Sequence, residues 1–128
     1  MPIRFRYFPD RDLLIHIGKG AVSIAEIETL RSERNARGVP RSVTNTLTDM
    51  RQSHFDFDLT ELRDNETGRP ESHYAGTRHA ELVADPRDTA VMLMWKKWLP
   101  ESVEVEVFST PERAYAWLGV EHEEGDLD

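Results

Sequence analysis

Residues 78–118 read RHAELVADPRDTAVMLMWKKWLPESVEVEVFSTPERAYAWL, and this stretch decides the fold class. Strand-like runs at 78–84 and 103–108 are each followed by a helix-start signal, Asp85-Pro86 in one case and Ser109-Thr110-Pro111 in the other. The pattern predicts two successive strand–helix units. Because strands that alternate with helices favour parallel pairing and right-handed crossovers, it indicates an α/β sheet covered by helices.

The N-terminal region predicts a β-hairpin followed by a helix. Apolar and basic residues alternate over 3–8, a second apolar run covers 13–17, and the turn-forming sequence Pro9-Asp10-Arg11-Asp12 lies between them. Ser23-Ile24-Ala25-Glu26 has the form of a capping box, in which each end residue bonds to the other's backbone N–H. It begins a helix that ends before Gly38.

The middle of the chain completes the order of elements. Residues 43–50 predict a strand, a loop follows over 51–57, and Asp58 caps a short helix over 59–64. Residues 65–76 are polar and predict an exposed connection. The complete order is ββαβαβαβα, an N-terminal β-hairpin and helix followed by three strand–helix units, without internal repeats.

Length and charge indicate one domain with an acidic end. A chain of 128 residues suits a single core. Of the net charge of −8, five charges lie in residues 121–128, which contain no Lys or Arg. We therefore expect a single domain over 1–120 and an acidic, disordered tail over 121–128. The basic residues are scattered among acids, which disfavours a nucleic acid as partner.

Composition also excludes several classes of protein. The chain has no cysteine, which rules out disulfides, thiolate catalysis and cysteine-ligated zinc. No stretch approaches the roughly 18 apolar residues that a membrane span needs. The first residues lack an apolar signal-peptide run. We therefore expect a cytoplasmic protein with no membrane span.

Three segments of the C-terminal half are similar to segments of a known family. They are Ala80-Glu81-Leu82-Val83-Ala84-Asp85, the run from Val103 to Phe108, and Ala114-Tyr115-Ala116-Trp117-Leu118. With the N-terminal hairpin and the Asp49 that closes the third strand, they make the chain resemble the SpoIIAA-like (STAS-type, STAS-Sec14-like) family of small uncharacterised bacterial proteins. The resemblance covers nearly the whole chain except the tail. It implies a STAS-like sheet and a regulatory domain without catalytic activity.

One branch of that family regulates anti-sigma factors through a Ser that is phosphorylated at the start of the second helix. The resemblance places this switch loop at Asp49, Ser53, Asp58 and Thr60. Here Asp58 is followed by Leu59, Ser53 lies too early and Thr60 lies inside the predicted helix. Since Asp58 already supplies a negative charge at the helix start, a phosphorylation switch is disfavoured.

The histidines and acids do not form a recognised metal or cofactor motif. His73 and His79 have Glu71, Glu81 and Asp85 nearby in the sequence, yet the chain lacks the closely spaced His pairs that are typical of zinc sites. We expect solvated loop histidines and one strand histidine, with no metal and no cofactor.

Signals for nucleophilic catalysis and phosphate binding are equally weak. There is no Gly-x-Ser-x-Gly elbow, and Ser53 and His54 are chain neighbours that seldom face each other. Gly18-Lys19-Gly20 is far shorter than a phosphate-binding loop and predicts a turn instead. Asp56 and Asp58 are better explained by capping and solvation than by acid–base chemistry. We therefore expect no enzymatic activity.

The helix that follows Asp85 carries an unusual amount of Met and Trp. Met92, Met94, Trp95 and Trp98 lie on or beside one stripe. Such a face can fill the core against a sheet. Alternatively, Met94, Trp95 and Trp98 form a dimer interface or line a small apolar pocket, since Met and Trp are common at both.

Three hypotheses of function follow from the sequence. The first is a regulatory or protein-interaction domain whose partner is a second copy, as a homodimer, or another regulatory protein. The second is a carrier of a small apolar or lipid-like ligand, because SpoIIAA-like proteins are similar in architecture to lipid-binding Sec14-type domains. The third and weakest is a metal-dependent or acid–base enzyme built on Asp49, His54, Asp58 and His79.

Overall fold

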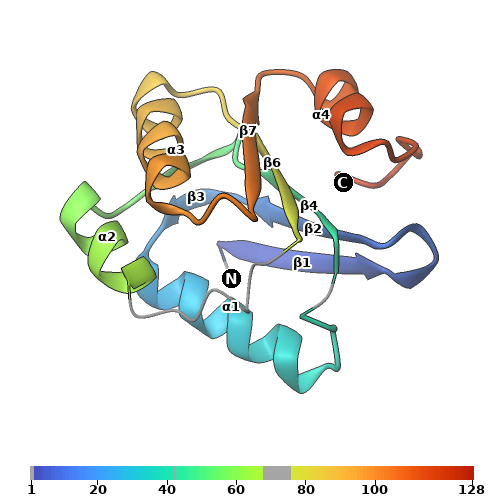
Figure 1. Cartoon of the computed structure of the whole chain (residues 1–128), viewed down its shortest axis with the longest axis horizontal. Helices are drawn as coiled ribbons and strands as arrows, with labels where there is room; N and C mark the ends of the chain where they lie inside the picture. Colours follow the sequence, from blue (N-terminus) through green and yellow to red (C-terminus); the bar gives the residue numbers. More distant parts are fainter. Residues whose placement is uncertain (1, 42, 68–75) are drawn as a thin grey trace.

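A five-stranded mixed sheet forms the centre of the protein (Figure 1). We describe it from a computed structural model that covers residues 2–41, 43–67 and 76–128. The strand order is β1-β2-β4-β6-β7, and only the β1–β2 hairpin is antiparallel. The strands are β1 (Ile3–Phe8), β2 (Leu13–Gly18), β4 (Asn45–Asp49), β6 (Arg78–Leu82) and β7 (Glu104–Phe108).

Helices cover both faces of this sheet, and each face has its own apolar core. The helices are α1 (Ile24–Ala36), α2 (Leu59–Thr67), α3 (Pro86–Trp98) and α4 (Pro111–Leu118). On one face, Leu30 of α1, Leu62 of α2 and Trp95 of α3 belong to the same buried cluster. On the other face, Ala114 and Leu118 of α4 pack on the buried strand residues. The predicted α/β class, with helices covering the sheet, is therefore confirmed.

The structure adds two short strands to the predicted order. β3 (Gly20–Val22) and β5 (Ser53–Phe55) pair in parallel as a separate two-stranded sheet. The sequence predicted a turn and a loop there, because three residues are too few for a period-two pattern to show. Between β1 and β2, a single 3-10 turn (Pro9–Arg11) makes the hairpin connection.

Local capping explains why the helices begin where they do. The Ser23 hydroxyl accepts a hydrogen bond from the backbone N–H of Glu26 at 3.2 Å, and Asp58 accepts one from Glu61 at 2.8 Å. Asp85 accepts from the N–H of Arg87 at 2.7 Å, ahead of a proline in the first turn of α3. These caps satisfy backbone donors that have no partner inside the helix, as the sequence predicted.

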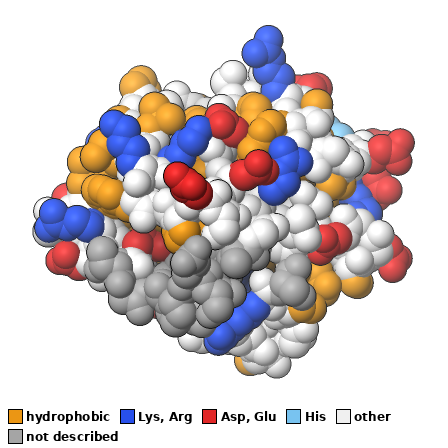
Figure 2. Space-filling model, in the orientation of Figure 1, with side chains coloured by type: hydrophobic (Ala, Val, Ile, Leu, Met, Phe, Trp, Pro, Cys, Tyr) orange, Lys and Arg blue, Asp and Glu red, His pale blue; other side chains and the backbone are white. Residues whose placement is uncertain are grey.

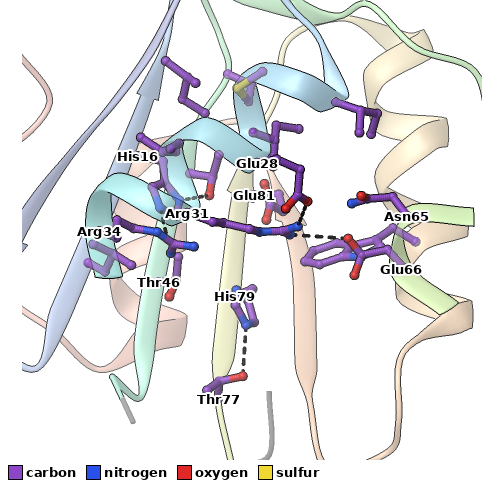
Figure 3. A pocket seen from close by; sticks show the side chains of 18 of the residues that line it. His16, Glu28, Arg31, Arg34, Thr46, Asn65, Glu66, Thr77, His79 and Glu81 are labelled. Carbon is purple, nitrogen blue, oxygen red and sulfur yellow. Dashed lines mark hydrogen bonds and ion pairs between the residues drawn. The ribbon is translucent and has the colours of Figure 1, made fainter. Parts of the chain in front are cut away.

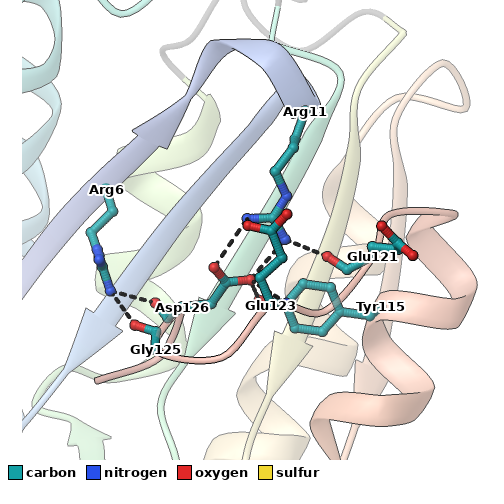
Figure 4. A network of polar contacts seen from close by, with 7 residues as sticks. All are labelled: Arg6, Arg11, Tyr115, Glu121, Glu123, Gly125 and Asp126. Atoms are coloured by element: carbon teal, nitrogen blue, oxygen red, sulfur yellow. Dashed lines mark hydrogen bonds and ion pairs between the residues drawn. The ribbon is translucent and has the colours of Figure 1, made fainter.

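The C-terminal residues pack against the hairpin, where the sequence predicted a disordered acidic tail (Figure 4). Asp126 is 3% exposed. Its carboxylate accepts hydrogen bonds from the Arg11 guanidinium at 2.7 and 3.0 Å and from the Tyr115 hydroxyl at 2.8 Å. Backbone carbonyls of the same segment accept from Arg4, Arg6 and Arg11. The composition shows only that the segment is acidic. The fold places basic residues of the β1–β2 hairpin against it.

These contacts control the ionisation of Asp126. Burial opposes its charge, but the hydrogen bonds from Arg11, Tyr115 and the backbone N–H of Glu123 outweigh burial and lower its pKa to about 2. The pKa of Tyr115 is raised, first by burial and then by its hydrogen bond to Asp126. At neutral pH the segment is therefore held by a charged carboxylate and a neutral phenol.

Loss of the Asp126 charge is expected to destabilise the whole protein. Asp126→Asn keeps the shape of the side chain but weakens its bonds to Arg11, so we expect the free energy of unfolding to fall by about 1–3 kcal/mol. Urea denaturation measures this change. Glu124→Gln, an exposed substitution in the same segment, serves as control. Equal stability of the two variants would show that the charge of Asp126 adds nothing to the stability of the fold.

Candidate functional site

A cavity of about 310 Å³ lies between the sheet and the helices α1, α2 and α3 (Figure 3). This volume has room for roughly ten water molecules and lies at the lower end of the ~300–1,000 Å³ that ligand pockets span. Part of its wall is apolar and comes from separate elements: Ile24, Ile27, Phe55, Phe57, Leu62 and Met92. An apolar molecule of modest size would therefore find a matching surface.

The floor of the cavity is polar because of the register of three parallel strands. His16 on β2, Thr48 on β4 and Glu81 on β6 are direct neighbours across the sheet, and all three line the cavity. Two residues earlier on β4 and β6, Thr46 and His79 are also direct neighbours across the sheet, and both line the cavity. Since side chains two residues apart share a face, each strand contributes its polar residues to the same side.

His16 bridges the floor and helix α1. Its Nε2 lies 3.2 Å from Nη1 of Arg34, and its Nδ1 lies 3.2 Å from the Thr48 hydroxyl. Because a guanidinium only donates, Nε2 accepts, which assigns the proton to Nδ1 and makes Thr48 the acceptor there. Burial, and then the positive charge of Arg34, lower the pKa of His16 well below its ordinary value. His16 is thus a neutral imidazole that does not withdraw a proton from Thr48.

His79 is held in the same neutral state. Its Nε2 lies 3.0 Å from the Thr77 hydroxyl, and its ring meets the indole of Trp95 edge to face, with 5.8 Å between the ring centroids. Burial, followed by the charges of Arg34 and Arg31, lowers its pKa to about 4. A base this weak is poorly matched to proton abstraction at neutral pH.

Glu81 is a buried carboxyl that carries a proton at neutral pH. It is 4% exposed, and burial raises its pKa to about 8. Neutralisation by protonation is the ordinary response of a carboxyl that water does not solvate. In this state Glu81 can donate a hydrogen bond into the cavity as well as accept one.

Charged residues of the helices complete the site. Arg31 extends from α1 across the cavity, and its guanidinium lies 2.8 Å from Glu28 and 3.4 Å from Glu66 of α2 (Figure 3). Arg34 extends from the same helix toward His16. Both arginines line the cavity. The arrangement joins an apolar wall, a neutral polar floor and a charged edge, which is suited to binding an amphipathic molecule.

The Met and Trp residues of α3 lie in different environments in the structure. Trp95 lines the cavity and is 8% exposed within the core. Trp98 packs on the outside of that core, and Met94 is half-buried. Neither Met94 nor Trp98 lines the cavity. The pocket hypothesis is therefore compatible with Trp95, and the interface hypothesis stays a prediction for the other two.

The switch-loop residues lie apart from the cavity. Asp49 accepts two hydrogen bonds from the side chain of Arg51, each 2.9 Å long. The Ser53 hydroxyl lies 3.2 Å from the sulfur of Met50, and a Cβ on Gly18 would come within 2.7 Å of its oxygen. Asp58 caps α2, and Thr60 is exposed one position into that helix. Their regulatory role stays a prediction.

The residues of the enzyme hypothesis do not converge. His79 lines the cavity, whereas Asp49, His54 and Asp58 do not. Among the metal-site residues considered from the sequence, Glu71 and His73 lie outside the described residues, and Asp85 is used as a helix cap. Within the described residues, no three His, Cys, Asp or Glu side chains are grouped so that they could hold a metal ion.

Sequence reasoning missed His16, Arg31, Arg34 and Glu81 as members of one site. A weak signal was present. Glu81 interrupts an apolar strand, and Thr46 and Thr48 fall on one parity of theirs. Polar residues at alternating positions of a covered strand point to a polar cavity or network. Arg31 and Arg34 reach the cavity because of how α1 packs, and no pattern in the sequence indicates that packing.

Comparison with known proteins supports the fold. No protein-family model matches the chain, and no curated protein matches it in sequence. Its structure is similar to the crystal structure of an uncharacterised protein of the DUF3478 family with a SpoIIAA-like fold, from Shewanella loihica PV-4. The TM-score is 0.61 with 16% identity, and the match covers 91% of each chain. The chain therefore has a SpoIIAA-like fold, as its sequence predicted.

The protonated state of Glu81 predicts a specific dependence of stability on pH. Its pKa rises from 4.5 to about 8 on folding, so the folded state keeps a proton that the unfolded state loses between these values. Its contribution to stability is complete below pH 4.5 and is lost as the pH rises to about 8. His79 acts in the opposite direction, but only below its ordinary pKa of 6.5.

Between pH 6.5 and about 8, Glu81 therefore acts with little opposition from His79. We expect the free energy of unfolding to fall by roughly 1–2 kcal/mol across this range. Glu81→Gln should remove most of the fall, whereas Glu112→Gln, an exposed change on α4, should retain it. Chemical denaturation at both pH values provides the measurement, and equal slopes in the three proteins would assign an ionised state to Glu81.

Proposed function

We propose that this chain is a cytoplasmic, non-enzymatic binding domain that carries or senses a small, largely apolar molecule in the cavity between the sheet and α1–α3. The observation that carries the proposal is the cavity of about 310 Å³, which joins apolar side chains to a polar floor. A ligand in this cavity would bury its apolar surface against the wall and could form hydrogen bonds with the floor.

The state of the polar groups favours binding over catalysis. His16 and His79 are neutral, and their pKa values lie too low for a general base at neutral pH. Thr48 accepts from His16, so that histidine does not activate its hydroxyl. Within the described residues, no helix is long and apolar enough to cross a membrane. The neutral histidines and the accepting Thr48 agree with a binding domain.

A neutral fluorescent probe tests this function directly. N-phenyl-1-naphthylamine, an uncharged apolar dye, should bind with increased fluorescence and one site per chain. Ile27→Trp places a larger side chain in the cavity wall and should abolish binding, while circular dichroism verifies that the fold is retained. Leu93→Trp makes the same kind of change on the exposed side of α3 and should leave binding intact. The proposal would be refuted if the wild type and Leu93→Trp both failed to bind the dye.

A protein-interaction domain is the second candidate, and one observation favours it. Among the described residues, the exposed large hydrophobic side chains are Leu59, 41% exposed on α2, and Leu93, 47% exposed on α3. These two helices pack against each other. A second copy of the chain is the partner that the resemblance suggests.

Light scattering coupled to size-exclusion chromatography tests this second function. If α2 and α3 form a homodimer interface, the wild type is a dimer and Leu93→Lys is a monomer of similar thermal stability. Trp98→Ala is a less specific probe, because Trp98 packs on the core and its truncation is expected to cost roughly 3–5 kcal/mol. A monomeric wild type would exclude the homodimer.

A further inference from the structure

Two buried hydrogen-bond donors belong to residues that line the cavity and lack acceptors. Among the described residues, the indole Nε1 of Trp95 and the Nδ2 of Asn65 are buried and have no hydrogen-bond partner. Both residues line the cavity. Buried donors without acceptors are uncommon in folded proteins, so this wall favours a nearby acceptor over a further donor. Protonated Glu81 adds a third side chain that can donate.

Two arginines bring positive charge to the edge of the cavity. Arg31 and Arg34 lie along its edge, and Arg31 is accompanied by Glu28 and Glu66. Their positive charge still reaches the floor, because it contributes to the lowered pKa values of both histidines. The positive charge of the two guanidinium groups favours an anion beside them and disfavours a cation.

We propose that the cavity selects a single-chain amphipathic carboxylate, with its anionic end at Arg31 and Arg34 and its hydrocarbon against Ile27, Phe57 and Met92. The chemistry is complementary: the carboxylate is purely an acceptor, and the guanidinium groups are purely donors. The volume of about 310 Å³ suits one short hydrocarbon chain and is small for a lipid with two. This inference rests on the proposed binding function and specifies its ligand.

The ion pair between Arg31 and Glu66 should control the affinity of the cavity for a carboxylate. Glu66 is buried and its carboxylate lies 3.4 Å from the Arg31 guanidinium, where a bound carboxylate would compete with it. Removing the charge of Glu66 should therefore strengthen binding of an anion. Removing the charge of Arg31 should weaken it. The two substitutions alter one ion pair and are expected to change affinity in opposite directions, which general destabilisation would not produce.

Three ligands of equal chain length test the selectivity: octanoate, 1-octanol and octylammonium. Each is titrated against the wild type loaded with N-phenyl-1-naphthylamine at neutral pH. We expect octanoate to displace the dye at a concentration roughly 10- to 100-fold lower than octylammonium, the range expected for a charge-assisted hydrogen bond, with octanol between them. Octanol as strong as octanoate would overturn the carboxylate inference and leave the apolar binding function standing.

The variants make the test specific to the cavity. Arg31→Gln should weaken octanoate binding by a larger factor than it changes binding of the neutral dye, and Glu66→Gln should tighten octanoate. Arg63→Gln removes an equal charge from an exposed position of α2 and should change neither. If Arg31→Gln fails to fold, Glu66→Gln still decides, and unchanged or weaker octanoate binding by it would refute the inference. Failure of the dye to bind the wild type would refute the binding function itself and this inference with it.

Discussion

The parallel register of β2, β4 and β6 is the constraint on which the rest of the site depends. It aligns His16, Thr48 and Glu81 across the sheet, on the face that α1, α2 and α3 cover. Parallel strands are ordinarily buried on both faces by apolar side chains. Here one face carries rows of polar groups under a cover of helices, so the helices enclose a cavity instead of closing onto the sheet.

Burial then determines the chemistry of these groups. A charged carboxylate or imidazolium away from water is costly, and each group moves to its neutral form. Glu81 keeps a proton and both histidines lose theirs. The remaining charges include those of α1 and α2, where Arg31 pairs with Glu28 and Glu66. The result is a neutral floor beside a charged edge, a distribution that suits recognition of an amphipathic molecule better than proton transfer.

The opposite face of the sheet is closed by an apolar core. There α4 and the C-terminal segment cover an apolar cluster, and Leu127 packs against it from the end of the chain. The segment is held by Asp126, whose buried charge is compensated by Arg11 and Tyr115. Figure 2 shows charged side chains of both signs interspersed on the face of the molecule in view, with apolar side chains between them. Polar groups therefore have different roles on the two faces of the sheet. Under α1, α2 and α3 they line a cavity, and under α4 they hold the C-terminal segment over an apolar core.

The sequence by itself determined the fold class, the main helices and their starts. These depend on local interactions: capping by Ser23, Asp58 and Asp85, and apolar periodicity over one or two turns or strands. Tertiary structure alone decided the cavity and the fate of the acidic end. Arg31 and Glu81 are fifty positions apart in the sequence, and Arg11 and Asp126 are separated by 115. Such pairs are set by strand register and by how helices and the last residues pack, and composition or periodicity does not encode them locally.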